Sequence, residues 1–270
     1  MTTVVAAMDN TPSAGAVLAS AAAVAQLFDA TLEAVHVRSD ECEIAAGHAR
    51  RAGVPLEIVD GGVVDSLVAV GREHDVAALV LGTREEHTPD KPLGSTALAV
   101  VAGVEKPVVL IPPRAAPLER IRRVLLPLEG TRRTSLAPAS MLEIARSAAV
   151  DVIVLHVFVE ASLPEFTDQP QHETAVWASE FLARYCPLGL RSVNLELRIG
   201  EPAETVVRVA EEIGVDLIAL GWNQLLAPGR AAIVRAVLER GRLPLMLIPA
   251  TTNTEGGKPN DRHARQLLEH

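Results

Sequence analysis

The chain has 270 residues, of which 49% are hydrophobic, 22% are charged and only 3% are aromatic. A formal net charge of −9 repels nucleic acid and anionic lipid, and so few aromatic side chains leave little surface for base stacking. No apolar run reaches the length of a membrane span, and the two cysteines are far apart in no metal-like spacing. These features predict two soluble domains of a cytoplasmic protein.

Short aliphatic runs alternate with helical patterns along the first part of the chain. Strands are predicted at residues 4–8, 31–37, 55–59, 76–81 and 107–111. Helices are predicted between them, at residues 16–30, 40–52, 63–73 and 95–104. Unbroken aliphatic strands separated by helices are typical of right-handed βαβ units, and therefore of an α/β fold with a parallel sheet.

A proline cluster at residues 112–117 interrupts this pattern, which then begins again. Two pairs of matching residues are 120 positions apart (129 − 9 and 156 − 36), and a third pair is 139 apart (221 − 82). An extra stretch in the second copy, residues 159–171 and the helix after it, accounts for most of this difference. The matching pairs are Asp9 and Glu129, His36 and His156, and Gly82 and Gly221. The sequence therefore predicts a tandem duplication, with domains at residues 1–113 and 118–250 and a flexible tail at residues 251–270.

Each half resembles a universal stress protein domain, and the whole chain resembles the tandem members of that family. The resemblance rests on four features: the first strand that ends in an acid, the second strand that contains Val-His-Val or Leu-His-Val, the Gly-Glu-Pro-Ala-Glu segment at residues 200–204 and the closing Pro-x-x-Leu-Ile-Pro strand. It implies two doubly wound five-stranded parallel sheets with strand order 3-2-1-4-5. It also implies that residues 108–111 pair with residues 245–248, which makes the chain an internal pseudo-dimer.

The loop between residues 82 and 96 is the main candidate binding site. A strand ends at Gly82, and Gly94, Ser95 and Thr96 open the next helix. Glycine allows a ligand to approach the backbone, and the unpaired N–H groups of a helix N-terminus favour an anion such as phosphate. An ordinary strand-to-helix connection capped by serine explains the same residues.

The resemblance makes this loop a nucleotide phosphate loop, in which Gly82 and the Gly94-Ser95 pair match the family's first glycine and its last Gly-Ser pair. The family's middle glycine is replaced by Glu85, and the final spacer is one residue short. A carboxylate there brings negative charge close to a phosphate. The resemblance also places Asp9 at the adenosine end of the site, where it has the alternative role of a helix N-cap, and the backbone of Val37 in the adenine pocket.

The second half keeps less of this pattern. Gly229-Arg230 stands in place of the Gly-Ser pair, and Trp222 follows Gly221. We therefore expect a degenerate second site. His36 and His156 lie in apolar strands at matching positions, where a structural role is a simpler interpretation than a metal pair.

The sequence and the resemblance together leave two functions open. One is a cytoplasmic stress-response or regulatory protein that binds ATP, with magnesium, through Asp9, Val37, Gly82, Gly94, Ser95 and Thr96. The other is an interaction or scaffold protein of the same fold that binds no nucleotide and acts on an unidentified protein partner. A third, weaker hypothesis is ATP hydrolysis. The sequence shows no identifiable base or metal site for it, so no catalytic residues are assigned. Homodimers of tandem chains agree with the family resemblance.

Overall fold

The structure is a computed structural model of the whole chain. It describes residues 1–39, 42–83, 95–128, 143–145, 147–159, 170–185, 193–222, 230–240 and 242–249. The predicted tail at residues 251–270 lies outside this part of the chain. None of the helices in these ranges is long and apolar enough to cross a membrane.

The first half contains alternating strands and helices, as the sequence predicts. Its strands are β1 (Thr3–Ala7), β2 (Thr31–Val37), β3 (Leu56–Val59), β4 (Val76–Gly82) and β5 (Val108–Ile111). Its helices are α1 (Ala14–Phe28), α2 (Glu43–Ala52), α3 (Val63–Gly71) and α4 (Ser95–Gly103). The predicted ends are correct to within a few residues.

The second half repeats the order with longer outer strands. Its strands are β6 (Arg123–Pro127), β7 (Asp151–Phe158), β8 (Val193–Ile199), β9 (Leu217–Trp222) and β10 (Leu245–Pro249). The helices with complete bounds are α6 (Pro170–Tyr185), α7 (Pro202–Ile213) and α8 (Arg230–Arg240).

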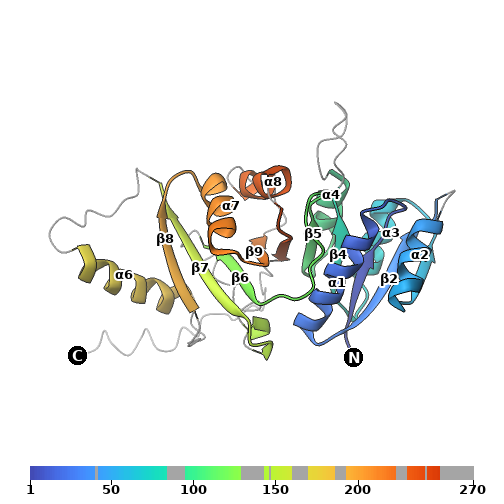
Figure 1. Cartoon of the computed structure of the whole chain (residues 1–270), viewed down its shortest axis with the longest axis horizontal. Helices are drawn as coiled ribbons and strands as arrows, with labels where there is room; N and C mark the ends of the chain where they lie inside the picture. The colour runs from blue at the N-terminus through green and yellow to red at the C-terminus, as the bar shows by residue number, and fades with distance from the viewer. Residues whose placement is uncertain are drawn as a thin grey trace, which may run out of the picture.

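All these strands form one ten-stranded sheet in the order β3-β2-β1-β4-β5-β10-β9-β6-β7-β8. Each half contributes strands in the order 3-2-1-4-5, which confirms the predicted topology. Figure 1 shows the first half in blue to green on the right and the second half in green to red on the left.

The two fifth strands pair at the centre of the sheet. β5 and β10 run antiparallel, with Leu245 opposite Leu110, Met246 opposite Val109 and Leu247 opposite Val108. All the other strand pairs are parallel. The predicted internal pseudo-dimer is therefore confirmed, and this pairing removes an exposed edge from each half.

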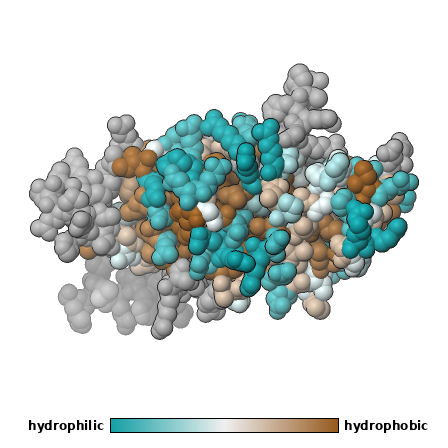
Figure 2. Space-filling model, in the orientation of Figure 1, coloured by the Kyte–Doolittle hydropathy of each residue, from teal (hydrophilic) through white to brown (hydrophobic). Residues whose placement is uncertain are grey.

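Each face of the sheet carries one apolar layer that extends across both halves. One layer contains residues of α1 and α6, including Val24 and Phe181, and strand residues from both halves. The other contains residues of α3, α4, α7 and α8. Figure 2 shows hydrophilic side chains over the front of the molecule, where α7 and α8 lie in Figure 1. The sheet is thus covered on both faces, which agrees with its aliphatic strands.

The proline-rich connection between the halves is packed onto the first half. Ala115 and Ile121 are 8% and 5% exposed and belong to the same apolar layer as α1. The buried Ser20 of α1 accepts a hydrogen bond from the backbone N–H of Leu118 at 3.4 Å. These contacts hold the connection against the first half at several points, including α1, so the connection does not behave as a free spacer.

Candidate functional site

Three of the predicted site residues lie at the carboxyl ends of neighbouring strands in the first half. β1 lies between β2 and β4, with Ala7 opposite both Val35 and Leu81. Two residues further along, Asp9 is therefore at the level of Val37, with Gly82 beside it at the end of β4. In a doubly wound sheet, ligands bind beyond the carboxyl ends of the strands where the strand order reverses. Here the reversal occurs between β1 and β4.

Asp9 is held by the loop that follows it. The Thr11 hydroxyl donates a hydrogen bond of 2.7 Å to Asp9 Oδ1, and it lies 2.6 Å from the Ser13 hydroxyl. The alternative role of Asp9 as the N-cap of the following helix is wrong, because α1 begins at Ala14 and Ser13 occupies the N-cap position. The Asp9 carboxylate is instead oriented by Thr11, just beyond the carboxyl end of β1.

The neighbouring Asn10 caps a helix that the sequence did not associate with it. Its side-chain oxygen accepts hydrogen bonds from the backbone N–H groups of Ile44 (2.9 Å) and Ala45 (3.3 Å), in the first turn of α2. Cys42, at the N-cap position of α2, makes no side-chain capping bond. The β1–α1 loop is therefore fixed to α2, and this restricts the backbone next to Asp9.

His36 also fixes the end of β1. Its ring is 3% exposed, and Nδ1 lies 2.8 Å from the carbonyl oxygen of Met8. Since a carbonyl oxygen only accepts, Nδ1 carries a proton and donates, and Nε2 lies 3.3 Å from the Ser39 hydroxyl. The Met8 N–H in turn donates to the Val35 carbonyl. These bonds give the buried histidine the structural role that its apolar strand suggested.

The phosphate end of the predicted site is only partly described. Helix α4 begins at Ser95, as predicted, and Thr96 is exposed at its first turn. Since α4 connects the parallel strands β4 and β5, its N-terminus lies at the edge of the sheet where Gly82 ends β4. Gly94 and Glu85 lie outside the described residues, so their predicted roles remain predictions.

Gly82 is tightly packed on the side that faces α1. A Cβ atom placed on it would lie 3.1 Å from Cγ2 of Val17 in α1. Thr83, the next residue, is 6% exposed, and its hydroxyl donates to the Ile111 carbonyl at 3.3 Å. The end of β4 is thus fixed between α1 and β5, and the packing of Val17 against Gly82 already favours a glycine at this position.

An exposed ion pair lies beside the Val37 end of the site. Arg38 follows Val37 directly, and its side chain donates to the carboxylate of Asp60, which follows β3. The hydrogen bond and the negative charge of Asp60 raise the pKa of Arg38, in that order of size. Neither residue is among the predicted site residues, although Arg38 and Asp60 both directly follow a predicted strand.

The second half keeps the histidine contact and changes its surroundings. His156 Nδ1 lies 2.8 Å from the Leu128 carbonyl oxygen, the counterpart of the His36–Met8 contact. An aromatic cluster surrounds this ring, whose centre lies 4.7 Å from Phe158, 5.4 Å from Trp177 and 4.8 Å from Phe181. Burial lowers the pKa of His156, and the hydrogen bond to Leu128 opposes this effect. Phe158 stands where the first half has Arg38, so aromatic packing replaces an ion pair.

The other distinctive residues of the second half lie mostly beyond what the structure describes. Glu129 and Gly229 are outside the described residues, and for Trp222 only the backbone is described, at the end of β9. Among the described residues, no group of three or more histidine, cysteine or acidic side chains is placed to hold a metal ion.

Comparison with known proteins now identifies the fold. Residues 120–249, which form the second half, match the universal stress protein family. The second half of the chain is therefore a universal stress protein domain. The first half has the same strand order and the same histidine contact at the end of its first strand. None of the curated proteins matches the sequence.

Solved structures are similar to the chain over both halves. A universal stress protein from Archaeoglobus fulgidus is 15% identical with a TM-score of 0.60, and the match covers 92% of this chain and 96% of that one. A putative universal stress protein from Pseudomonas aeruginosa is 12% identical with a TM-score of 0.57, covering 92% of each chain. A functionally unknown protein from the same species is 12% identical with a TM-score of 0.59, again covering 92% of each chain. At these identities the similarity shows a common fold.

Proposed function

We propose that this protein binds ATP in its first half, as part of a cytoplasmic stress-response or regulatory role. The adenosine would lie against the carboxyl ends of β1 and β2, near Asp9 and the backbone of Val37. The phosphates would lie between Gly82 and the first turn of α4, where Gly94, Ser95 and Thr96 offer backbone N–H groups and hydroxyls. Magnesium would enter with the phosphates, as it commonly does at nucleotide sites.

One observation carries this proposal. The carboxyl ends of the strands, at the point where the strand order reverses, bring together Asp9, Val37, Gly82 and the N-terminus of α4. These positions come from four separate parts of the sequence, and a doubly wound sheet places its ligands at this point. Asp9 is also pre-oriented by Thr11, which limits the rotamer freedom that binding would otherwise remove.

A difference between the halves supports a single site per chain. The first half ends β2 with the open, charged pair of Arg38 and Asp60, whereas Phe158, 7% exposed, takes the place of Arg38 in the second half. Aromatic rings from α6 pack against Phe158 and His156 there. We infer that the second half uses this region for internal packing, in agreement with its degenerate loop.

Calorimetric titration with ATP and magnesium tests the site. Asp9→Ala is expected to weaken binding by about tenfold or more, because it removes a charged hydrogen-bonding group worth about 1.5–3 kcal/mol. Glu129→Ala, at the equivalent position of the second half, is the matched control and should leave affinity unchanged. The stoichiometry should be at most about one nucleotide per chain, and two equivalent sites would contradict the assignment.

Two further substitutions test the loop itself. Glu85→Gly removes a negative charge near the phosphates and should strengthen binding by about fivefold to tenfold. Gly94→Val should weaken binding, because a branched side chain blocks the approach of phosphate to the helix N-terminus. If neither substitution changes affinity in a folded protein, the loop is a plain connection. The chain is then better explained as an interaction protein without nucleotide.

A further inference from the structure

The strand β8 forms the outer edge of the sheet in the second half. It pairs with β7 over seven residue pairs, from Val152 opposite Val193 to Phe158 opposite Ile199, and it ends the strand order. In the described part of the chain no other strand pairs with it. An edge strand of this length presents a row of backbone groups that another strand can join.

The hydrogen-bond pattern shows which groups of β8 face outward. The N–H of Gly200 donates to the Phe158 carbonyl, so residues 194, 196, 198 and 200 direct their backbone groups toward β7. The backbone groups of residues 193, 195, 197 and 199 therefore point to the free edge. Arg198 agrees with this assignment, because its guanidinium donates to the outward Leu197 carbonyl at 3.1 Å.

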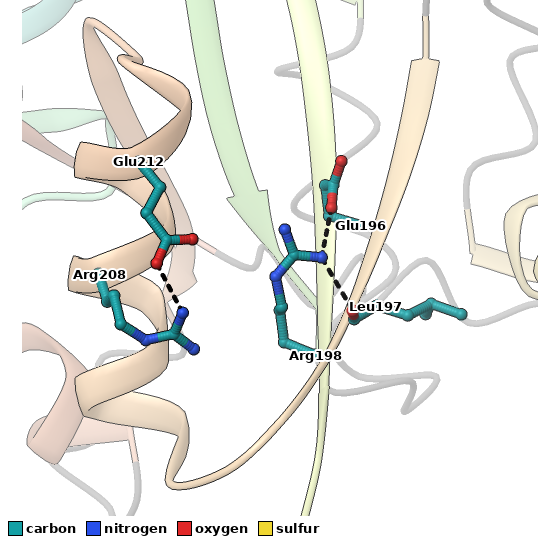
Figure 3. A network of polar contacts seen from close by, with 5 residues as sticks. All are labelled: Glu196, Leu197, Arg198, Arg208 and Glu212. Carbon is teal, nitrogen blue, oxygen red and sulfur yellow. Dashed lines mark hydrogen bonds and ion pairs between the residues drawn. The ribbon is translucent and has the colours of Figure 1, made fainter.

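Side chains alternate along the same strand. Val193 and Leu195 pack against the apolar layer that contains α1 and α6. Glu196 and Arg198 lie on the other side, where they form an ion pair of 2.6 Å with each side chain 33% exposed. Figure 3 shows this pair beside α7, where Arg208 and Glu212 form a separate ion pair of 2.7 Å. The charged residues of β8 therefore pair with each other, and those of α7 form their own ion pair.

We propose that β8 is a docking edge for a second copy of this chain, and that the two copies of β8 pair antiparallel about Leu197. In this register Leu197 faces itself as a hydrogen-bonded pair, and the outward groups of residues 195, 197 and 199 all find partners. Glu196 then faces Arg198 of the other copy, in the non-hydrogen-bonded positions where opposing side chains are closest. Leu195 faces Ile199 of the other copy on the apolar side.

Other twofold registers fit less well. Centring the pair on Glu196 or Arg198 places like charges opposite each other, which is destabilising. Centring it on residue 195 leaves Glu196 opposite Asn194 and Arg198 without an opposite charge. Only the Leu197 register makes the segment Leu195–Ile199 complementary to itself in both charge and apolar character.

Exposure supports this choice of edge. Apart from Met1, the most exposed large apolar side chains among the described residues are Ile199 at 61% and Val176 of α6 at 59%. The opposite edge of the sheet, β3, has four residues, and only two of them face outward. A twofold pair centred on β3 at Glu57 would bring two carboxylates together. The second half therefore carries the self-complementary edge.

Pairing requires one exchange of contacts. Arg198 releases the Leu197 carbonyl, which then accepts from the Leu197 N–H of the other copy, and the guanidinium turns to the opposing Glu196. The Leu197 carbonyl then has a backbone partner and the Arg198 guanidinium has a charged one, so the exchange leaves neither of them buried without a hydrogen bond.

Sedimentation velocity over a concentration series tests the proposal on the full chain. The wild type should form a dimer. Glu196→Arg and Arg198→Glu should each raise the dimer dissociation constant by about tenfold or more, because each replaces two attractive cross-strand pairs with repulsive ones. Glu212→Arg and Arg208→Glu are the matched controls: each makes the same charge change and breaks an ion pair on α7, away from the edge. They should leave the dimer intact.

Two further samples separate pairing from misfolding. The double variant Glu196→Arg/Arg198→Glu restores opposite charges across the pair and should dimerise again. An equimolar mixture of the two single variants should form a heterodimer more tightly than either variant forms a homodimer. Ile199→Lys, at an exposed position that leaves the fold intact, should also give monomers. Circular dichroism confirms folding in each case.

The proposal is wrong if the wild type stays monomeric throughout the series. It is also wrong if Ile199→Lys and the single charge reversals dimerise like the wild type, since the contact would then lie elsewhere. Neither result bears on ATP binding, which is measured at the opposite half of the sheet.

Discussion

Replacing Leu79 with alanine tests whether the two halves of the sheet unfold as one body. Leu79 lies in β4 of the first half, is fully buried, and faces Val108 in the neighbouring β5. It belongs to an apolar layer that also contains Leu245 and Leu125 of the second half. The central pairing of β5 with β10 connects the two halves through the backbone as well. A loss of packing at Leu79 should therefore destabilise the whole sheet.

The expected magnitude follows from complete burial. Leucine-to-alanine substitutions at buried sites cost about 3–5 kcal/mol, which includes the energy of the remaining cavity. With an m value of about 3 kcal/mol per molar urea, the midpoint should fall by about 1–1.7 M. Ile218→Ala, at the equivalent and 1% exposed position of the second half, should give a similar shift.

Urea unfolding with two probes makes the test specific. Both tryptophans, Trp177 and Trp222, lie in the second half, so tryptophan fluorescence reports that half alone, whereas far-UV circular dichroism reports both. In Leu79→Ala the two transitions should remain superimposed and shift together. If the fluorescence midpoint does not move while the circular dichroism becomes biphasic, the halves unfold independently and the reasoning is refuted.

Two other features of the packing make predictions. Gly103→Ala should destabilise the fold by about 1–3 kcal/mol, because its Cβ would lie 2.7 Å from Cγ2 of Val68 in α3. In thermal unfolding, Gly47→Ala in α2 should do the reverse and stabilise by up to about 1 kcal/mol, since the nearest atom is the flexible Arg51 guanidinium at 3.5 Å. Burial lowers the pKa of His156 from its ordinary 6.5, so the unfolded chain binds that proton more readily and stability should fall as the pH drops through about 6.5. His156→Gln, which keeps a donor for the Leu128 carbonyl, should reduce the difference in unfolding free energy between pH 7 and pH 5; an equal difference in both proteins would contradict this.

The order of strands and helices in each half could be predicted because the signals are local. Each strand is an aliphatic run bounded by turn residues, and several helix ends carry their own markers. Gly53 and Gly214 adopt the left-handed conformation that ends α2 and α7. In the Gly-Glu-Pro-Ala-Glu segment, Glu201 caps α7 by accepting a hydrogen bond from the Glu204 N–H at 2.8 Å.

The candidate site was predictable only where its residues lie at the ends of strands. Asp9, Val37 and Gly82 are separated along the chain, and their meeting at one edge follows from the parallel strand order. The detailed contacts were not predictable in the same way. Asn10 lies just before α1 in the sequence, yet it caps α2 through backbone N–H groups that are 34 and 35 residues away. Such a bond depends on how two loops pack and has no signature in the neighbouring sequence.

The sequence by itself determined the repeated α/β pattern, the position of the loop before Ser95 and the loss of the Gly-Ser pair in the second half. These follow from periodicity and residue type, which act over a few residues. Only the tertiary structure decided that the proline-rich connection packs onto α1 and that His156 lies among aromatic rings. It also decided that β8 forms an edge whose charges complement themselves. Contacts of this kind depend on which faces and edges meet across the sheet, and sequence distance carries no information about them.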